Sequence, residues 1–585
     1  MIWLVLTACS SDPAGKAPIV TSDADLPPTP PTTPTTSPPP ETDGPADAVI
    51  VKAAVVTLDG ASNRFEAFAI RGGEIVWVGV EPVPELWIGP TTKVVDLEGA
   101  TVLPGLFDVH NHILEAFHPA GGTCIVDGYG MLSSHLSTLE NCQDDQVGSD
   151  WVVGWGFDLW SALSSPGSPA GLMDSVIPDR PAVMMEASSH AAWVNTLALE
   201  ALGYDATTPD PPGGVILREA DGTPTGLLMD AASEAAFDLA LANNAEMPAL
   251  NEEALRAGLA EANRNGLTGI GDGRCYWKRG YVEAWHAVAD AGELTVRANV
   301  PLWAYPNEDD DSQLATLKAY YDVAPDAKLR FGQVKMYVDG LVWITTGALL
   351  EPYTDNAITD PLGLNYFDPL RLKRYVSELE EAGFDVQLHG IGDRGVREGL
   401  DAIEAARVEH GELGRRHRIT HVEFVDPEDI PRFAELNVTA DIQLAGWWTE
   451  PEFLHDSDRV VGAERVNTLN YRVRDLHEAG ARITLSSDYD VASMSPFVGI
   501  ARAVDRGDQS LPDVESALRA MTTDAAWLLG FDDIAGSIEV GKRADFVVVD
   551  RDPFSTETLA ETVVLWTVFD GDEVFRDAGF VPAGW

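Results

Sequence analysis

The chain has 585 residues, of which 45% are hydrophobic and 23% are charged. A chain of this length and composition buries a large core, which excludes a small binding module and a wholly disordered protein. Its 39 basic and 93 acidic residues give a formal net charge of −54, and such a surface repels nucleic acid and anionic headgroups. We therefore expect no nucleic-acid partner.

The amino terminus resembles the lipobox of bacterial lipoproteins, because an apolar segment ends in Leu-Thr-Ala directly before Cys9. The segment is too short to span a bilayer, and a chance cysteine in an apolar tail is the alternative. Every residue from Pro27 to Pro40 is Pro, Thr or Ser, which suits an extended spacer. We expect a signal and lipobox over residues 1–9, a disordered linker over 10–46, and a bacterial cell-envelope protein whose contact with the membrane is a lipid on Cys9.

Three cysteines remain in the rest of the chain. If the protein is exported, Cys124 and Cys142 either form a disulfide or stay reduced, and the sequence leaves both open. No Cys-x-x-Cys spacing is present, so the sequence does not support a structural zinc knuckle.

Short strands with turn signals are predicted at both ends of the globular part. The first set lies at residues 48–53, 67–70 and 74–79, with an Arg-Gly-Gly turn before the third strand. A similar pattern returns at residues 536–550 and 562–569. We expect residues 47–102 plus 536–585 to form one composite β-sandwich.

Between these ends, over residues 103–535, apolar strand-like runs alternate with helical stretches, such as those at 251–265, 369–382 and 466–479. This alternation predicts an α/β fold with a parallel sheet. No Gly-x-Gly-x-x-Gly follows an early strand, which favours a (β/α)8 TIM-type barrel over an open doubly wound sheet. Residues 204–230, rich in Pro and Gly, are interpreted as an insertion.

Five of the strand-like runs end in ionisable or metal-ligating side chains, at His110 with His112, Lys335, His389, His421 and Asp488. Alternate residues of a strand share a face, so His110 and His112 point the same way. Lys335 interrupts an apolar strand, where a bare ammonium is costly. Barrel enzymes keep their active sites at the carboxyl ends of the strands, so we expect the five runs to meet there. Two hydrogen-bonded core imidazoles, and an ion pair of Lys335 with Asp339, are the structural alternatives.

The order His-x-His, Lys, His, His, Asp, preceded by Leu-Pro-Gly and enclosed by a split sandwich, resembles the amidohydrolase superfamily. Within it, the chain is similar to amidohydrolase family 3, the YtcJ-like branch that includes N-substituted formamide deformylases. The motifs that carry this similarity, over about residues 47–570, are Ser189–Asn195, Pro212–Arg218 with Gly222–Gly226, Val334–Gly340 and Leu388–Asp393.

The resemblance implies one or two divalent metal ions, with zinc favoured by the nitrogen-rich ligands. It assigns one ion to His110, His112 and Asp488 and a second to His389 and His421. Lys335, carboxylated by carbon dioxide, bridges them. Asp488 is interpreted as the proton shuttle, and His190 as a catalytic residue that contacts the substrate. A packing histidine near a turn is the alternative for His190.

Three positions depart from the pattern of the family: the Ile-Thr before His421, the Tyr-Asp after Asp488, and Asn111. They remove no proposed ligand, but residues around the ligands tune a metal site, so metal identity and number stay open. Seven further histidines are expected to be surface or packing residues: His118, His135, His286, His410, His417, His455 and His477. Six tryptophans are candidates for a substrate cleft or for ordinary core: Trp155, Trp160, Trp193, Trp343, Trp447 and Trp448.

These features predict a metal-dependent hydrolase that cleaves a non-peptide carbon–nitrogen bond of a small molecule, such as an N-substituted amide or formamide. A related barrel reaction on a cyclic amide, lactone or ester, or an isomerisation, is one alternative. A catalytically silent, solute-binding envelope lipoprotein is another. The oligomeric state stays open, a homodimer included.

Overall fold

The computed structural model describes residues 44–585 except 119–123, 127, 129, 147–148, 243, 355–357, 359, 450–453 and 556. The predicted signal segment, Cys9 and nearly all of the predicted linker lie outside the described residues. Among the helices that are described, none combines the length and the apolar composition needed to cross a bilayer.

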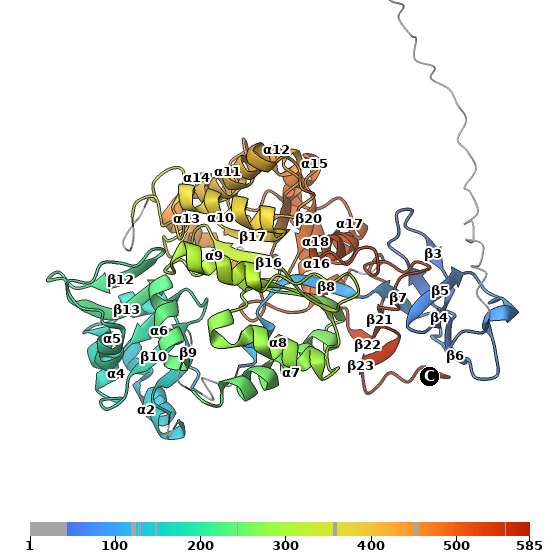
Figure 1. The fold of residues 1–585 in the computed structure, drawn as a ribbon, viewed down its shortest axis with the longest axis horizontal. Helices are drawn as coiled ribbons and strands as arrows, with labels where there is room; N and C mark the ends of the chain where they lie inside the picture. The colour runs from blue at the N-terminus through green and yellow to red at the C-terminus, as the bar shows by residue number, and fades with distance from the viewer. Residues whose placement is uncertain are drawn as a thin grey trace, which may run out of the picture. The chain divides into compact units, whose positions relative to one another are not determined.

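A parallel sheet of eight strands forms the centre of the chain (Figure 1). Its strands, in sheet order, are β20 (Ile483–Leu485), β19 (Thr439–Ile442), β18 (Arg418–His421), β17 (Asp385–Gly390), β16 (Leu329–Tyr337), β15 (Arg297–Trp303), β14 (Leu267–Asp272) and β8 (Leu106–Asn111). The chain after β20 returns to β8, where the Asp488 amide donates to the His110 carbonyl at 2.9 Å. The sheet therefore closes into the predicted (β/α)8 barrel.

Helices follow most of these strands and bury one apolar face against them. In chain order they are α7 (Met247–Arg264), α8 (Tyr281–Asp290), α9 (Asp310–Ala319), α10 (Pro369–Ala382), α11 (Asp393–His410), α12 (Ile430–Glu435), α13 (Leu454–Val461), α14 (Ala463–Leu469), α15 (Val473–Glu478), α16 (Pro496–Val504), α17 (Val514–Ala520) and α18 (Thr523–Leu529). The bounds of α10 are those that the sequence predicts.

The single helix predicted at 466–479 is wrong, because the structure has α14 and α15 there with a break between them. Tyr471 lies in the break with a φ of 43°, a left-handed conformation that ends a helix. Its amide donates to the carbonyl of Glu423 at 2.7 Å. A tertiary contact therefore overrides the local helical pattern.

Two flanking sheets are built from the ends of the described chain: amino-terminal strands form one, and strands from both ends form the other. One sheet has the order β5 (Glu74–Gly79), β4 (Ala67–Arg71), β1 (Ala48–Val51) and β6 (Lys93–Asp96). The other has the order β23 (Asp572–Arg576), β22 (Val564–Phe569), β21 (Phe546–Val549), β7 (Thr101–Pro104), β2 (Ala54–Val56) and β3 (Arg64–Phe65). Phe68 of the first sheet packs edge-on against Phe546 of the second, with ring centroids 5.2 Å apart.

The Leu-Pro-Gly motif before His110, at residues 103–105, is divided between the sandwich and the barrel. β7 ends at Pro104 and β8 starts at Leu106. At Gly105 a Cβ atom would lie 2.1 Å from the Thr268 hydroxyl oxygen. Glycine is therefore required where the chain crosses from one sheet to the other.

The insertion is larger than the predicted segment 204–230. A separate mixed sheet has the order β12 (Gly214–Arg218), β13 (Pro224–Asp230), β11 (Ala191–Val194), β10 (Ala182–Glu186) and β9 (Val152–Phe157). Its helices are α2 (Leu136–Asp145), α3 (Leu159–Leu163), α4 (Pro169–Asp174), α5 (Thr196–Leu202) and α6 (Ala231–Leu241). Cys124 and Cys142, whose pairing the sequence left open, form a disulfide beside this sheet, with Cα atoms 5.1 Å apart.

Candidate active site

The five predicted runs end at the same mouth of the barrel. His110 lies in β8, Lys335 in β16, His389 in β17 and His421 at the end of β18, while Asp488 follows β20. Neighbouring parallel strands keep these positions in register, as the pairing of Tyr337 with His389 shows. Residues separated by up to 378 positions (488 − 110) in the chain therefore meet at the carboxyl ends of the strands.

His110, His112 and Asp488 bring one ligand atom each within 4.8 Å of one another, close enough to hold a metal ion. The Asp488 Oδ1 atom lies 3.0 Å from His112 Nε2 and 3.4 Å from His110 Nε2. The two imidazole rings come from one strand end, as the His-x-His spacing predicts. Carboxylate and imidazole donors in this combination suit a divalent transition metal.

Thr420 fixes the orientation of the His110 ring. Its hydroxyl donates to the Asp441 carboxylate at 2.8 Å and lies 2.6 Å from His110 Nδ1. The Thr420 hydroxyl has one proton, which it donates to Asp441. The hydrogen bond between His110 and Thr420 therefore uses a proton on His110 Nδ1. The Nε2 atom of His110 therefore keeps its lone pair, on the side that faces Asp488.

His389 and His421 pack beside this group, with ring centroids 4.2 Å apart. His421 Nδ1 lies 3.9 Å from Asp488 Oδ2, and His389 Nε2 lies 3.4 Å from the Gly340 carbonyl. The remaining nitrogens, His389 Nδ1 and His421 Nε2, are buried and have no hydrogen-bond partner among the described residues. Buried polar atoms without partners are rare in proteins, so these two atoms require an explanation.

Lys335 is a third residue of this site with a buried nitrogen that has no hydrogen-bond partner among the described residues. Its side chain is fully buried, and Nζ has no hydrogen-bond partner in the part of the chain that the structure describes. The alternative ion pair with Asp339 is not formed there: the Asp339 carboxylate instead accepts from the amides of Ala348, Ile391 and Gly392. Burial lowers the pKa of Lys335 well below its ordinary value.

Burial also keeps most of the cluster's imidazoles neutral. It lowers the pKa of His421 to about 3 and the pKa values of His110 and His389 well below the ordinary value. Burial opposes ionisation of Asp488, but the hydrogen bond from His112 lowers its pKa overall. Neutral imidazoles beside an ionised carboxylate are the forms that bind metal ions.

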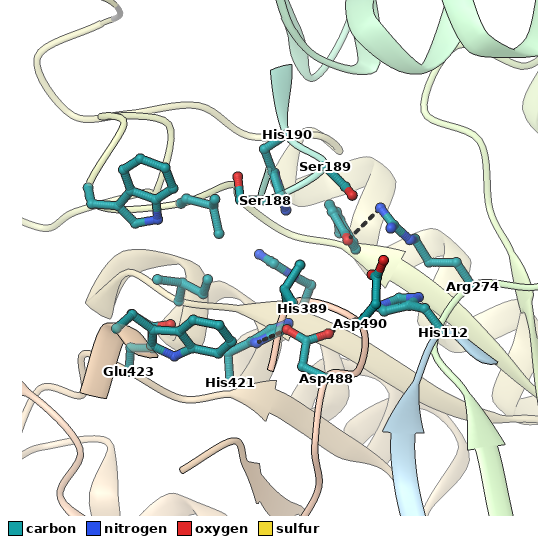
Figure 2. A pocket seen from close by; sticks show the side chains of 16 residues that line it. His112, Ser188, Ser189, His190, Arg274, His389, His421, Glu423, Asp488 and Asp490 are labelled. Atoms are coloured by element: carbon teal, nitrogen blue, oxygen red, sulfur yellow. Dashed lines mark hydrogen bonds and ion pairs between the residues drawn. The ribbon is translucent and has the colours of Figure 1, made fainter. Parts of the chain in front are cut away.

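A pocket opens above these residues, lined by His112, Ser188, Ser189, His190, Arg274, Tyr337, Leu341, Trp343, His389, Ile391, His421, Glu423, Trp448, Asp488, Asp490 and Val491. Figure 2 shows His190 on the opposite side of the pocket from His421 and Asp488, with Arg274 and Glu423 at its two ends. Of the six candidate tryptophans, Trp343 and Trp448 line the pocket, whereas Trp193 is buried within the insertion.

Sequence reasoning missed three charged residues of the pocket: Arg274, Glu423 and Asp490. A signal for each was present. Arg274 comes two residues after the end of β14, and the two carboxylates come two residues after His421 and Asp488. The Arg274 guanidinium is buried and contacts Glu115 at 3.3 Å, and burial raises the pKa of Glu423 to about 7. Positions just after a strand end share the barrel mouth with the predicted ligands.

Residues 93–575 match the sequence profile of the amidohydrolase family. The N-substituted formamide deformylase of Arthrobacter pascens is 28% identical over 548 residues, which cover 90% of this chain and 97% of that protein. The putative amidohydrolase YtcJ of Bacillus subtilis is 29% identical over 546 residues, which cover 89% of this chain and 98% of that protein.

The fold is similar to solved structures as well. The crystal structure of an uncharacterized metal-dependent hydrolase from Pyrococcus horikoshii superposes with a TM-score of 0.67 at 22% sequence identity. The superposition covers 87% of this chain and 98% of the Pyrococcus chain.

Proposed function

The chain belongs to the amidohydrolase family and is a hydrolase, and we propose that it cleaves the carbon–nitrogen bond of small N-substituted amides, formamides included. The full-length similarity to the N-substituted formamide deformylase supports this substrate class. The apolar side chains of Leu341, Trp343, Ile391 and Trp448 line the pocket beside its polar centre, which suits an apolar N-substituent.

The observation that carries the proposal is the set of donor atoms at the barrel mouth. His110, His112 and Asp488 would hold one divalent ion, and His389 with His421 a second. The buried nitrogens without partners, described above, fit this assignment because a metal ion would satisfy them. Zinc suits these ligands. When bound, the ions supply Lewis acidity that polarises the substrate carbonyl and makes water a nucleophile near neutral pH.

Lys335 would bridge the two ions as a carbamate. Its fully buried amine has a lowered pKa, and a neutral amine is the form that adds to carbon dioxide, with release of one proton. The product is a carboxylate that would fill the space between the histidine pairs. Protein loaded with ¹³C-bicarbonate should show one carbamate signal that is absent from Lys335→Ala. A wild-type protein without that signal contradicts this assignment.

The protein's own groups would handle the proton and the substrate. The Asp488 carboxylate, 3.0 Å from His112, would take a proton from the attacking water and deliver it to the leaving nitrogen. His190, across the pocket, would contact the substrate (Figure 2).

A substrate panel tests the function. Protein reconstituted with zinc or manganese and bicarbonate is offered N-substituted formamides, other amides, lactones and cyclic ureas, with His389→Ala as the inactive control. We expect amine release from formamides or simple amides. Turnover of lactones or cyclic ureas alone would contradict the proposed substrate class.

We also propose that the protein is anchored at the cell envelope through Cys9. The sequence before Cys9 and the Pro/Thr/Ser spacer support this location, and the Cys124–Cys142 disulfide supports an oxidising compartment. Intact-mass analysis of protein recovered from its native host should find a lipid on Cys9. An unmodified amino-terminal methionine would refute the anchor.

A further inference from the structure

His190, which the proposed function places against the substrate, forms a buried pair with Asp230, a residue that has no role in that function yet. His190 precedes β11 and Asp230 ends β13, and these strands are antiparallel neighbours, with Ala191 opposite Met229. The Asp230 amide donates to the His190 carbonyl at 2.7 Å. The pairing of these strands therefore places the side chains of His190 and Asp230, which are 40 residues apart in the sequence, next to each other.

The side chains make a short hydrogen bond. His190 Nδ1 lies 2.6 Å from Asp230 Oδ1, and the two residues are 6% and 1% exposed. An ionised carboxylate only accepts hydrogen bonds, so the proton of this contact belongs to Nδ1. In a neutral imidazole with its proton on Nδ1, the Nε2 atom is an acceptor.

Two further contacts fix the direction of the His190 ring. It stacks on Tyr337, with centroids 5.5 Å apart and planes 13° apart, and its centroid lies 5.7 Å from that of His389. Figure 2 shows the ring pointing into the pocket toward His389. Asp230 holds Nδ1, which is bonded to Cγ, whereas Nε2 lies at the tip of the ring, the part that points into the pocket.

The backbone of Asp230 is held in a costly conformation. Its φ of 51° and ψ of −124° lie in a region that favours glycine. Such strain persists only where the surrounding structure enforces it, and it concentrates at functional sites. Here the strained residue is the one that supplies the carboxylate to His190.

We propose that Asp230 is a positioning residue that holds His190 with Nε2 as a hydrogen-bond acceptor toward the substrate, so that the pocket selects amides whose nitrogen carries a hydrogen. This inference rests on the proposed function and narrows it. The N–H of a secondary amide satisfies the acceptor at Nε2. An N,N-disubstituted amide or an ester leaves that acceptor without a partner in a closed pocket, which costs binding and turnover.

Paired substrates test the selection. The ratio of kcat/KM for N-benzylformamide to that for N-benzyl-N-methylformamide is measured on zinc-loaded protein, for wild type, Asp230→Gly, His190→Ala and the double variant. Glycine suits the backbone at position 230 and deletes the carboxylate. We expect the ratio to fall by about 10- to 100-fold in Asp230→Gly. The double variant should have the same ratio as His190→Ala, because Asp230 acts through His190.

A matched control and a conservative variant sharpen the result. Asp174→Asn removes a carboxylate that accepts from the Thr196 amide elsewhere in the insertion, and it should keep the wild-type ratio. Asp230→Asn, which retains an acceptor oxygen, should have a ratio between that of Asp230→Gly and that of wild type. The proposal is overturned if Asp230→Gly keeps the wild-type ratio while His190→Ala loses it.

A spectroscopic readout separates this proposal from the proposed function. In protein labelled with ¹⁵N-histidine, the His190 signals, assigned by their loss in His190→Ala, should show the proton on Nδ1 and none on Nε2. Asp230→Gly should move the proton to Nε2. A wild-type ring protonated on Nε2 contradicts the inference whether or not any formamide is hydrolysed, whereas absence of hydrolysis with the expected tautomer contradicts only the function.

Discussion

Two clusters of charged groups, each with buried members, lie at opposite ends of the barrel strands, and they differ in how their charges are satisfied. At the amino end of β15, Arg297 donates to Asp545 at 2.9 Å, and Arg543 and Lys328 each contact Asp570 at 2.7 Å. At the carboxyl ends, Lys335 Nζ, His389 Nδ1 and His421 Nε2 have no hydrogen-bond partner among the described residues.

The difference separates structural charge from functional charge. A cluster of ions that pair with one another joins the sandwich to the barrel and needs nothing from outside the chain. Buried nitrogens without partners are costly unless a bound group completes them. Removing a member should therefore cost mainly stability at the first cluster and mainly activity at the second.

Asp488→Asn should have the largest effect, on activity. Loss of the proton shuttle should lower kcat by about 10²- to 10⁴-fold, while the melting temperature of metal-free protein stays near that of wild type. Asp524→Asn, whose carboxylate pairs with Arg482 outside the pocket, is the matched control and should retain kcat. Full activity in Asp488→Asn would overturn the role of that carboxylate.

Arg297→Met tests the paired cluster. It leaves Asp545, which is 2% exposed, without its buried cation, so the free energy of unfolding should fall by about 3–5 kcal/mol in urea titrations. The kcat of the folded fraction should not change, because the substitution lies at the far end of β15 from the pocket. A variant with wild-type stability and reduced kcat would contradict the assignment of this cluster to stability rather than activity.

Substitution of Asp570 should have the smallest effect, a change in the free energy of unfolding that depends on pH. Burial opposes its ionisation, but the charges and hydrogen bonds of Arg297, Lys328 and Arg543 lower its pKa to about 2. Because the folded pKa lies below the unfolded value of about 3.8, its contribution is present above pH 4 and is lost as the pH falls from about 4 to 2. Asp570→Asn should therefore be less stable than wild type by about 2 kcal/mol at neutral pH.

The measurement is the free energy of unfolding of both proteins between pH 2 and 7. The difference between them should shrink on acidification across the stated window. A difference that stays constant across that window would show that the Asp570 carboxylate is not stabilised by its cations.

The sequence predicted the barrel, the sandwich and the position of the ligand cluster because each depends on local patterns. His110, Lys335 and His389 each sit in an apolar strand, and the parallel register of a barrel then brings them to one end. The mixed sheet of the insertion was only partly predicted, since its apolar runs have the same composition as barrel strands. The helix break at Tyr471 depends on a contact with Glu423 that no local pattern contains.

The pocket lining was predicted least well. Arg274 and Glu423 enter it because each comes two residues after a strand end, and this signal can be used only once the strand ends are known. The partnership of Asp230 with His190 depends on the register of two antiparallel strands. That register follows from the packing of the whole insertion, so the pair becomes visible only in the structure.

The most direct test of the account is the metal content of the full-length protein after reconstitution with zinc or manganese and bicarbonate. We expect about one to two divalent ions per chain, with a marked loss in a variant that carries both His110→Ala and His389→Ala. Less than about 0.2 ion per chain in the wild type, or an equal content in the double variant, would contradict the assignment of these residues as ligands.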